Sequence, residues 1–211
     1  MDCAICGTRR PRRFCPGING NICTVCCGEE REVTVDCPLD CEFLIAARKH
    51  EKLNEIVADA IPNSDIQPTR KHLEANEELL MYLVRALVTA ALSTRGVVDF
   101  DVRDALDGLI RTYRTLESGM YYESVPANAM AANLFRHLQQ AIQQFRADEH
   151  AALCLSKTRD SHVLIILVYL QRIELDRNNG RRRGRAFLHA IKDHYEVPEP
   201  AAPSTSSLLL P

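Results

Sequence analysis

Eight cysteines in the first 41 residues carry the clearest chemical signal in this chain. Six of them form the pairs Cys3-x-x-Cys6, Cys23-x-x-Cys26 and Cys37-x-x-x-Cys41. A turn between cysteines at such spacing directs both sulfurs at one tetrahedral centre, as in structural zinc sites. Eight thiolates suffice for two zinc ions. The predicted metal ligands are Cys3, Cys6, Cys15, Cys23, Cys26, Cys27, Cys37 and Cys41.

The adjacent residues Cys26 and Cys27 indicate how the ligands divide. Neighbours on an extended strand point to opposite sides, so each thiol could serve a different ion. We prefer an interleaved pairing, with one zinc held by Cys3, Cys6, Cys23 and Cys26 and the other by Cys15, Cys27, Cys37 and Cys41. Two alternatives stay open: Cys15 and Cys27 join the first pair, or Cys26 and Cys27 exchange roles.

Two knuckles followed by a helix at the last ligand pair resemble a treble-clef or cross-brace zinc module. MYND and HIT-type fingers, RING and B-box domains share this logic, and the resemblance covers residues 1–45. It implies a module that binds protein or nucleic acid. Those families usually include a histidine ligand, and none lies within residues 1–49. The resemblance therefore selects no single family and does not extend to the helical part.

Other thiol chemistries fit the sequence less well. An iron–sulfur cluster also uses four thiolates and is the main rival for the metal. A redox Cys-x-x-Cys requires a thioredoxin-like sheet, which no pattern here indicates. Catalytic zinc keeps an open position and favours histidine or carboxylate, whereas all-cysteine sites are closed and structural. The helical part has no phosphate loop, nucleophile elbow or His-Glu-x-x-His motif, so we expect no enzyme.

Two arginine clusters offer a second kind of chemistry. The first follows the first knuckle and the second precedes the last predicted helix. Both could contact phosphate in nucleic acid or in a phosphorylated partner. Both could also act internally, by neutralising zinc-bound thiolates or by interacting with a helix end. The residues are Arg9, Arg10, Arg12, Arg13, Arg181, Arg182, Arg183 and Arg185.

Apolar periodicity predicts a mainly α fold, with a small N-terminal cysteine-rich zinc module, a long helix and an all-α helical bundle. The module covers residues 1–45, and its helix begins near Pro38 and continues to about residue 60. Residues 61–76 read as a polar linker and residues 77–196 as the bundle, with helices at 77–94, from Asp99 or Asp101 to Gly119, from Pro126, at 162–177 and at 183–195. Residues 197–211 are rich in proline, serine and alanine and are expected to be disordered.

Composition limits the function classes. The formal net charge is -2, so any electrostatic partner must be chosen by a local patch. No export leader is visible and the longest apolar run, Val163–Leu170, is too short to span a membrane, so we expect a cytoplasmic protein. We expect Cys154 to be a buried small hydrophobe. Tyr113, Tyr121 and Tyr122 could form a binding surface, but we expect them to pack between helices with their hydroxyls outward.

These patterns favour a non-enzymatic zinc-binding interaction or adaptor protein, whose partner is another protein or a second copy. The alternative is a nucleic-acid-binding regulator that uses the arginines at 9–13 and 181–185. The scattered histidines are expected to be surface or satisfied interior residues, because metal sites need converging groups. They are His72, His137, His150, His189 and His194.

Overall fold

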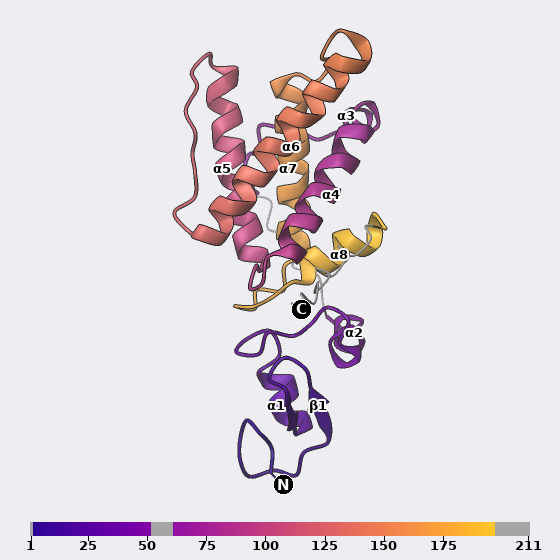
Figure 1. Cartoon of the computed structure of the whole chain (residues 1–211), viewed down its shortest axis with the longest axis vertical. Helices are drawn as coiled ribbons and strands as arrows, with labels where there is room; N and C mark the ends of the chain where they lie inside the picture. The colour runs from indigo at the N-terminus through magenta and orange to yellow at the C-terminus, as the bar shows by residue number, and fades with distance from the viewer. Residues whose placement is uncertain (1, 52–60, 197–211) are drawn as a thin grey trace, which may run out of the picture.

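A cysteine-rich module lies at one end of a helical bundle (Figure 1). The computed structural model describes residues 2–51, which form the module, and residues 61–196, which form the bundle. Helices dominate the described residues, and a single two-stranded sheet accompanies them. The predicted mainly α fold class is therefore confirmed. The N-terminus lies at the end of the module that is farthest from the bundle (Figure 1).

The module contains a hairpin and two short helices. Strands β1 (Arg13–Cys15) and β2 (Gly20–Ile22) pair antiparallel, and helices α1 (Thr24–Glu29) and α2 (Glu42–Arg48) follow. Few apolar side chains other than cysteine are buried here: Ile22, Val35 and Leu44. At about 1.5–3 kcal/mol for each fully buried side chain, they stabilise the module too little to offset its chain entropy. The module therefore needs a further source of stability, and the sequence predicts that bound metal supplies it.

Helix α2 begins later than predicted. The expected start near Pro38 is wrong, because the Cys41 amide donates to the Pro38 carbonyl in a turn, at 3.1 Å. Cys41 has an extended backbone and precedes the first helical residue, Glu42. Cys41 lines a small cavity with Cys15, Cys27 and Cys37, and the helix begins about one turn later than predicted. The helix ends at Arg48, with Lys49 and His50 in a turn; the predicted continuation over residues 52–60 lies outside the described residues.

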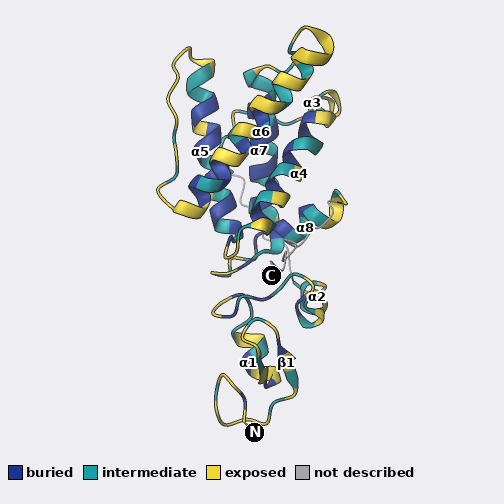
Figure 2. Ribbon diagram, in the orientation of Figure 1, coloured by how far each residue is buried: buried dark blue, intermediate teal, exposed yellow. Residues whose placement is uncertain are grey.

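Six helices form the bundle: α3 (Arg70–Ala75), α4 (Glu77–Ser93), α5 (Asp99–Glu117), α6 (Ala129–Leu153), α7 (Asp160–Arg177) and α8 (Ala186–His194). Helix α5 packs against α6 and α7, and α4 packs against α6. Figure 2 shows their buried faces turned toward one another. Seven apolar residues along α4 are buried: Leu79, Leu80, Leu83, Val84, Leu87, Val88 and Ala91. None of the described helices is long and apolar enough to cross a membrane.

Local signals fix the helix ends. Gly119 adopts a positive φ of 80° directly after α5, as expected for a stop residue. Helix α6 begins at Ala129 and not at Pro126, because the Asn128 side chain caps it by accepting from the Met130 amide at 2.9 Å. Helix α8 begins at Ala186, three residues later than predicted, because the residues before it contact the module.

The predicted linker at 61–76 is attached to the bundle. Arg114 donates to the Asp65 carboxylate at 2.7 and 3.0 Å, and Arg172 donates to the Ile66 carbonyl at 2.5 Å. Ile66 and Leu73 also pack against the core of the bundle. This segment therefore continues the bundle and contains α3.

Candidate metal centre

Four cysteines converge at the start of α1. One sulfur each from Cys3, Cys6, Cys23 and Cys26 lies within 4.8 Å of all the others, so the group could hold a metal ion. Cys3 and Cys6 flank a turn closed by the bond from the Gly7 amide to the Cys3 carbonyl, at 2.8 Å. Cys23 is the N-cap of α1 and Cys26 lies in its first turn. The interleaved pairing places these same four residues together.

Amide and hydroxyl groups donate to these sulfurs, as they do to thiolates in metal sites. The Cys23 amide donates to Cys3 Sγ at 3.3 Å and the Cys26 amide to Cys23 Sγ at 3.4 Å. The Thr8 hydroxyl lies 3.5 Å from Cys6 Sγ, and Arg9 Nη1 lies 4.0 Å from Cys26 Sγ. Cys3, Cys23 and Cys26 are buried, so these donors replace lost water contacts.

The thiols have divergent acidities. Hydrogen bonds from the Thr8 side chain and from nearby amides lower the pKa of Cys6 to about 5. A hydrogen bond from the Cys26 amide lowers the pKa of Cys23. Burial and the neighbouring thiols raise the pKa of Cys26 to about 12. Four adjacent sulfurs cannot all be charged without a compensating cation, which a bound divalent metal would supply.

The remaining four module cysteines line one small cavity. Its volume is about 20 Å³, and Cys15, Cys27, Cys37 and Cys41 contribute to its wall together with Phe43 and Leu44. Cys15 and Cys37 are buried, and burial raises the pKa of the Cys37 thiol. These four sulfurs are less tightly grouped than those of the first cluster, which among the described residues are the ones that lie within 4.8 Å of one another.

Cys26 and Cys27 reach different clusters from a helix. The expectation that they lie on an extended strand is wrong, because the Cys23 side chain caps α1 and both residues are helical. Adjacent helical residues are about 100° apart around the axis, which is enough to separate the two sulfurs. Cys26 joins the first cluster and Cys27 lines the second cavity. Cys26 and Cys27 therefore belong to different clusters, as predicted, although they lie on a helix and not on a strand.

Two of the four arginines at 9–13 contact sulfur. Arg9 approaches Cys26 Sγ as described above, and Arg13 Nη1 lies 3.6 Å from Cys27 Sγ. The Arg13 guanidinium also stacks over the Phe43 ring, 3.9 Å from its centroid. Arg31 adds a third contact, 3.8 Å from Cys27 Sγ. These arginines serve the internal role that the sequence offered as one of two interpretations.

The second arginine cluster joins the module to the bundle. Arg181 Nη1 donates to the Arg31 carbonyl at 2.6 Å. Arg185 Nη2 donates to the Asp36 carboxylate at 2.6 Å and to the Cys37 carbonyl at 2.8 Å. The loop before α8 therefore contacts the backbone of a cysteine in the second cavity. Arg182 and the Arg183 side chain are exposed and have no such contact among the described residues.

Glu32 is the centre of this junction. Its side chain is fully buried and accepts from Arg48 Nη2 at 2.8 Å, from Asn179 Nδ2 at 2.9 Å and from the Arg185 amide at 3.0 Å. Its carbonyl accepts from the Arg183 amide at 2.8 Å. Its φ of 53° is unusual for a residue other than glycine, and such backbone persists only where surrounding contacts hold it.

Sequence reasoning did not identify Glu32 as a key residue. No sequence pattern distinguished Glu32 from the other acidic residues of the module, although its side chain is buried. Its partners Asn179 and Arg185 are far away in the chain, so no local spacing marks the contact. The only available hint was an acidic residue in the module together with an arginine cluster in the bundle.

Two expectations about the bundle are wrong. Cys154 is exposed, because it ends α6 in a left-handed conformation with φ of 53° that turns it away from the core. Tyr121 and Tyr122 are 64% and 69% exposed, because the segment between α5 and α6 runs along the outside of the bundle (Figure 2). Tyr113 is buried, as expected.

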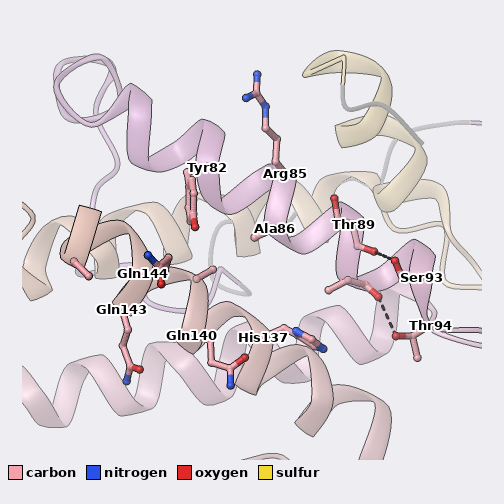
Figure 3. A pocket seen from close by; sticks show the side chains of 13 residues that line it. Tyr82, Arg85, Ala86, Thr89, Ser93, Thr94, His137, Gln140, Gln143 and Gln144 are labelled. Atoms are coloured by element: carbon pink, nitrogen blue, oxygen red, sulfur yellow. Dashed lines mark hydrogen bonds between the residues drawn. The ribbon is translucent and has the colours of Figure 1, made fainter. Parts of the chain in front are cut away.

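A groove on the bundle has few groups that could take part in catalysis. It lies between α4 and α6, with a volume of about 960 Å³, and Figure 3 shows its polar side chains. The Ser93 and Thr94 hydroxyls donate to backbone carbonyls of their own helix (Figure 3). Arg85 and His137 are the charged or titratable members of a lining otherwise made of amides, alanines, hydroxyls and Tyr82. No nucleophile there is paired with a base.

The histidines do not gather at a metal site. Within residues 2–51 and 61–196, the potential ligand group consists of cysteines alone. His189 pairs with Asp193 at 3.1 Å, and burial lowers its pKa. His72 Nδ1 lies 3.3 Å from the Gln67 carbonyl.

Comparison of the chain with protein-family models, with curated proteins and with solved structures found no match.

Proposed function

We propose that this chain is a non-enzymatic, zinc-binding interaction protein. The observation that carries the proposal is the cluster of Cys3, Cys6, Cys23 and Cys26, whose sulfurs lie within 4.8 Å of one another. Four thiolates complete a tetrahedron around zinc and leave no position for a substrate. The metal in such a site supports a fold and does not perform a reaction.

A second zinc would be held by Cys15, Cys27, Cys37 and Cys41. Their shared cavity, of about 20 Å³, suits an ion and is too small for an organic cofactor. Arg13 and Arg31 both approach Cys27 Sγ and would offset the negative charge of a four-thiolate site. Thiolate ligands need a compartment that keeps them reduced, which supports the expected cytoplasmic location.

The partner would be another protein or a second copy of this chain. Five exposed apolar residues support this view, and together they are named the Met120–Met130 surface: Met120, Tyr121, Tyr122, Val125 and Met130. A concentrated group of exposed large apolar side chains typically marks a protein-interaction site. Aromatic residues and methionine are also the types that interfaces favour.

Site-specific photo-crosslinking tests this proposal. A photoreactive phenylalanine analogue at Tyr122 should yield one discrete cross-linked species in cells, identified by mass spectrometry as a partner protein or a second copy. The matched control places the analogue at Leu155, which is 62% exposed and lies outside the Met120–Met130 surface. The same diffuse products from both positions would contradict the proposal.

A further inference from the structure

The β1–β2 hairpin has two different faces. Side chains alternate along a strand, so Cys15 and Ile22 turn toward the module core and are buried. Arg12, Phe14 and Asn21 turn the other way and are exposed. Phe14 lies opposite Asn21 in the strand register, which places the ring and the amide side by side on the outer face.

Phe14 is an unusual residue for this outer face. Its side chain is 55% exposed, although burial would stabilise the small module. The neighbouring Asn21 side chain forms no hydrogen bond within the described part of the chain, so its amide is available to a ligand. An exposed ring beside a free amide offers a surface for stacking and for polar contact with a planar group.

Arg10 and Arg12 supply positive charge next to Phe14. Both are exposed, and within residues 2–51 and 61–196 neither side chain forms a hydrogen bond or an ion pair. Their neighbours Arg9 and Arg13 contact sulfurs. The module's acidic Glu32 and Asp36 are bonded at the junction with the bundle. Two unpaired cations therefore lie close to Phe14 in the sequence, at the start of the hairpin.

Single-stranded nucleic acid matches this combination best. Its unpaired bases stack on aromatic rings, and its phosphates attract guanidinium groups. A duplex hides the faces of its bases, and an acidic peptide would use the arginines without requiring a stacking ring. We infer that the outer hairpin face formed by Arg10, Arg12, Phe14 and Asn21 binds single-stranded RNA or DNA. This goes beyond the proposed function, because both its surface and its ligand differ from those of the Met120–Met130 surface.

Fluorescence anisotropy with the zinc-loaded full chain tests the inference. The probes are labelled oligouridine and oligothymidine of about ten nucleotides, within the span of known single-strand sites. Phe14→Leu should weaken binding between about 5-fold and 150-fold, the range for loss of one stacked base. Phe14→Tyr should retain binding, because it keeps the ring. The double substitution Arg10→Ala and Arg12→Ala should reduce the slope of log K against log salt by about 1.4, corresponding to two phosphates.

Three controls make the result decisive. Arg182→Ala removes an exposed arginine of the other cluster and should leave oligonucleotide binding unchanged. Polyglutamate should compete poorly, since it offers charge without bases. The zinc content of each variant and its cross-linking through position 122 should equal those of the wild type, so that failure here is distinguishable from failure of the proposed function. Equal binding by wild type and Phe14→Leu, or equal competition by polyglutamate, would overturn the inference.

Discussion

Replacing Glu32 with alanine should separate the module from the bundle without removing its metal. Glu32 is fully buried and accepts hydrogen bonds from Arg48 in the module and from Asn179 and the Arg185 amide in the bundle. It contributes no sulfur and is not a member of the four-cysteine cluster. The substitution therefore removes the contacts to the bundle and the ion pair with Arg48, and leaves the proposed ligands in place.

The expected cost follows from the groups that lose their partner. Breaking a buried ion pair by removing one member costs about 3–5 kcal/mol, because the other charge stays buried and unpaired. The charge left unpaired here is that of Arg48, whose side chain is 10% exposed. The unpaired Asn179 amide and Arg185 N–H add to the loss. Since 1.4 kcal/mol is about tenfold in an equilibrium, opening of the junction should become at least about a hundred times more frequent.

Hydrogen exchange followed by mass spectrometry measures this opening directly. The amides of Arg183 and Arg185 donate to Glu32, so their exchange reports the junction. We expect both to exchange about a hundred times faster in Glu32→Ala, with unchanged zinc content. Glu32→Gln keeps an acceptor oxygen but loses the charge opposite Arg48, so it should lie between wild type and Glu32→Ala.

Glu29→Ala is the matched control. Glu29 is exposed on α1, close to Glu32 in the sequence, and its side chain makes no hydrogen bond among the described residues. Its substitution should leave exchange at Arg183 and Arg185 unchanged. Wild-type exchange in Glu32→Ala would refute the conclusion that this buried carboxylate holds the module to the bundle.

Two further substitutions test the bundle. Burial raises the pKa of Asp99 to about 7 in the folded chain from its usual 3.8, so the folded state binds this proton more tightly than the unfolded state does. The stability that this group contributes is fully present below about pH 3.8 and is lost as pH rises to about 7. Asp99→Asn should abolish this decline, which urea titrations at several pH values would measure. Gly108→Ala would place a Cβ 2.6 Å from the Ser124 carbonyl oxygen, so it should lower the free energy of unfolding by about 1–3 kcal/mol although alanine favours helix. In the control Gly28→Ala the added Cβ meets nothing within 4 Å, so this variant should be neutral or stabilising by up to about 1 kcal/mol. A lower free energy of unfolding for Gly28→Ala than for Gly108→Ala would contradict the packing at α5.

Local patterns predicted the features that short segments determine. The spacing of Cys3, Cys6, Cys23 and Cys26 predicted their convergence, because a knuckle is set by a few residues of backbone. Apolar periodicity predicted a helix over 77–94, and the structure has α4 at Glu77–Ser93. Boundaries failed where a single side chain decides them, as at Asn128 before α6.

Long-range contacts were beyond the reach of these patterns. The bonds of Glu32 to Asn179 and Arg185 join residues about 150 positions apart, and one sequence contains no signal for such a pairing. The same limit explains why Arg185 resembled a phosphate ligand, since exposed and junction arginines have the same local sequence. Cys154 was misplaced because its expected burial came from the general preference of cysteine, whereas its left-handed backbone lies at the end of α6.

Metal content of the adjacent-cysteine variants is the most direct test of the two-site module. Native mass spectrometry of the reduced full chain should find two zinc ions, with no visible absorption from an iron–sulfur cluster. After dialysis against a chelator, Cys26→Ser should lose the ion of the first cluster and Cys27→Ser the ion of the second, so each keeps one. A wild-type chain that stays folded through residue 41 without metal, or two variants that both keep two ions, would contradict the assignment.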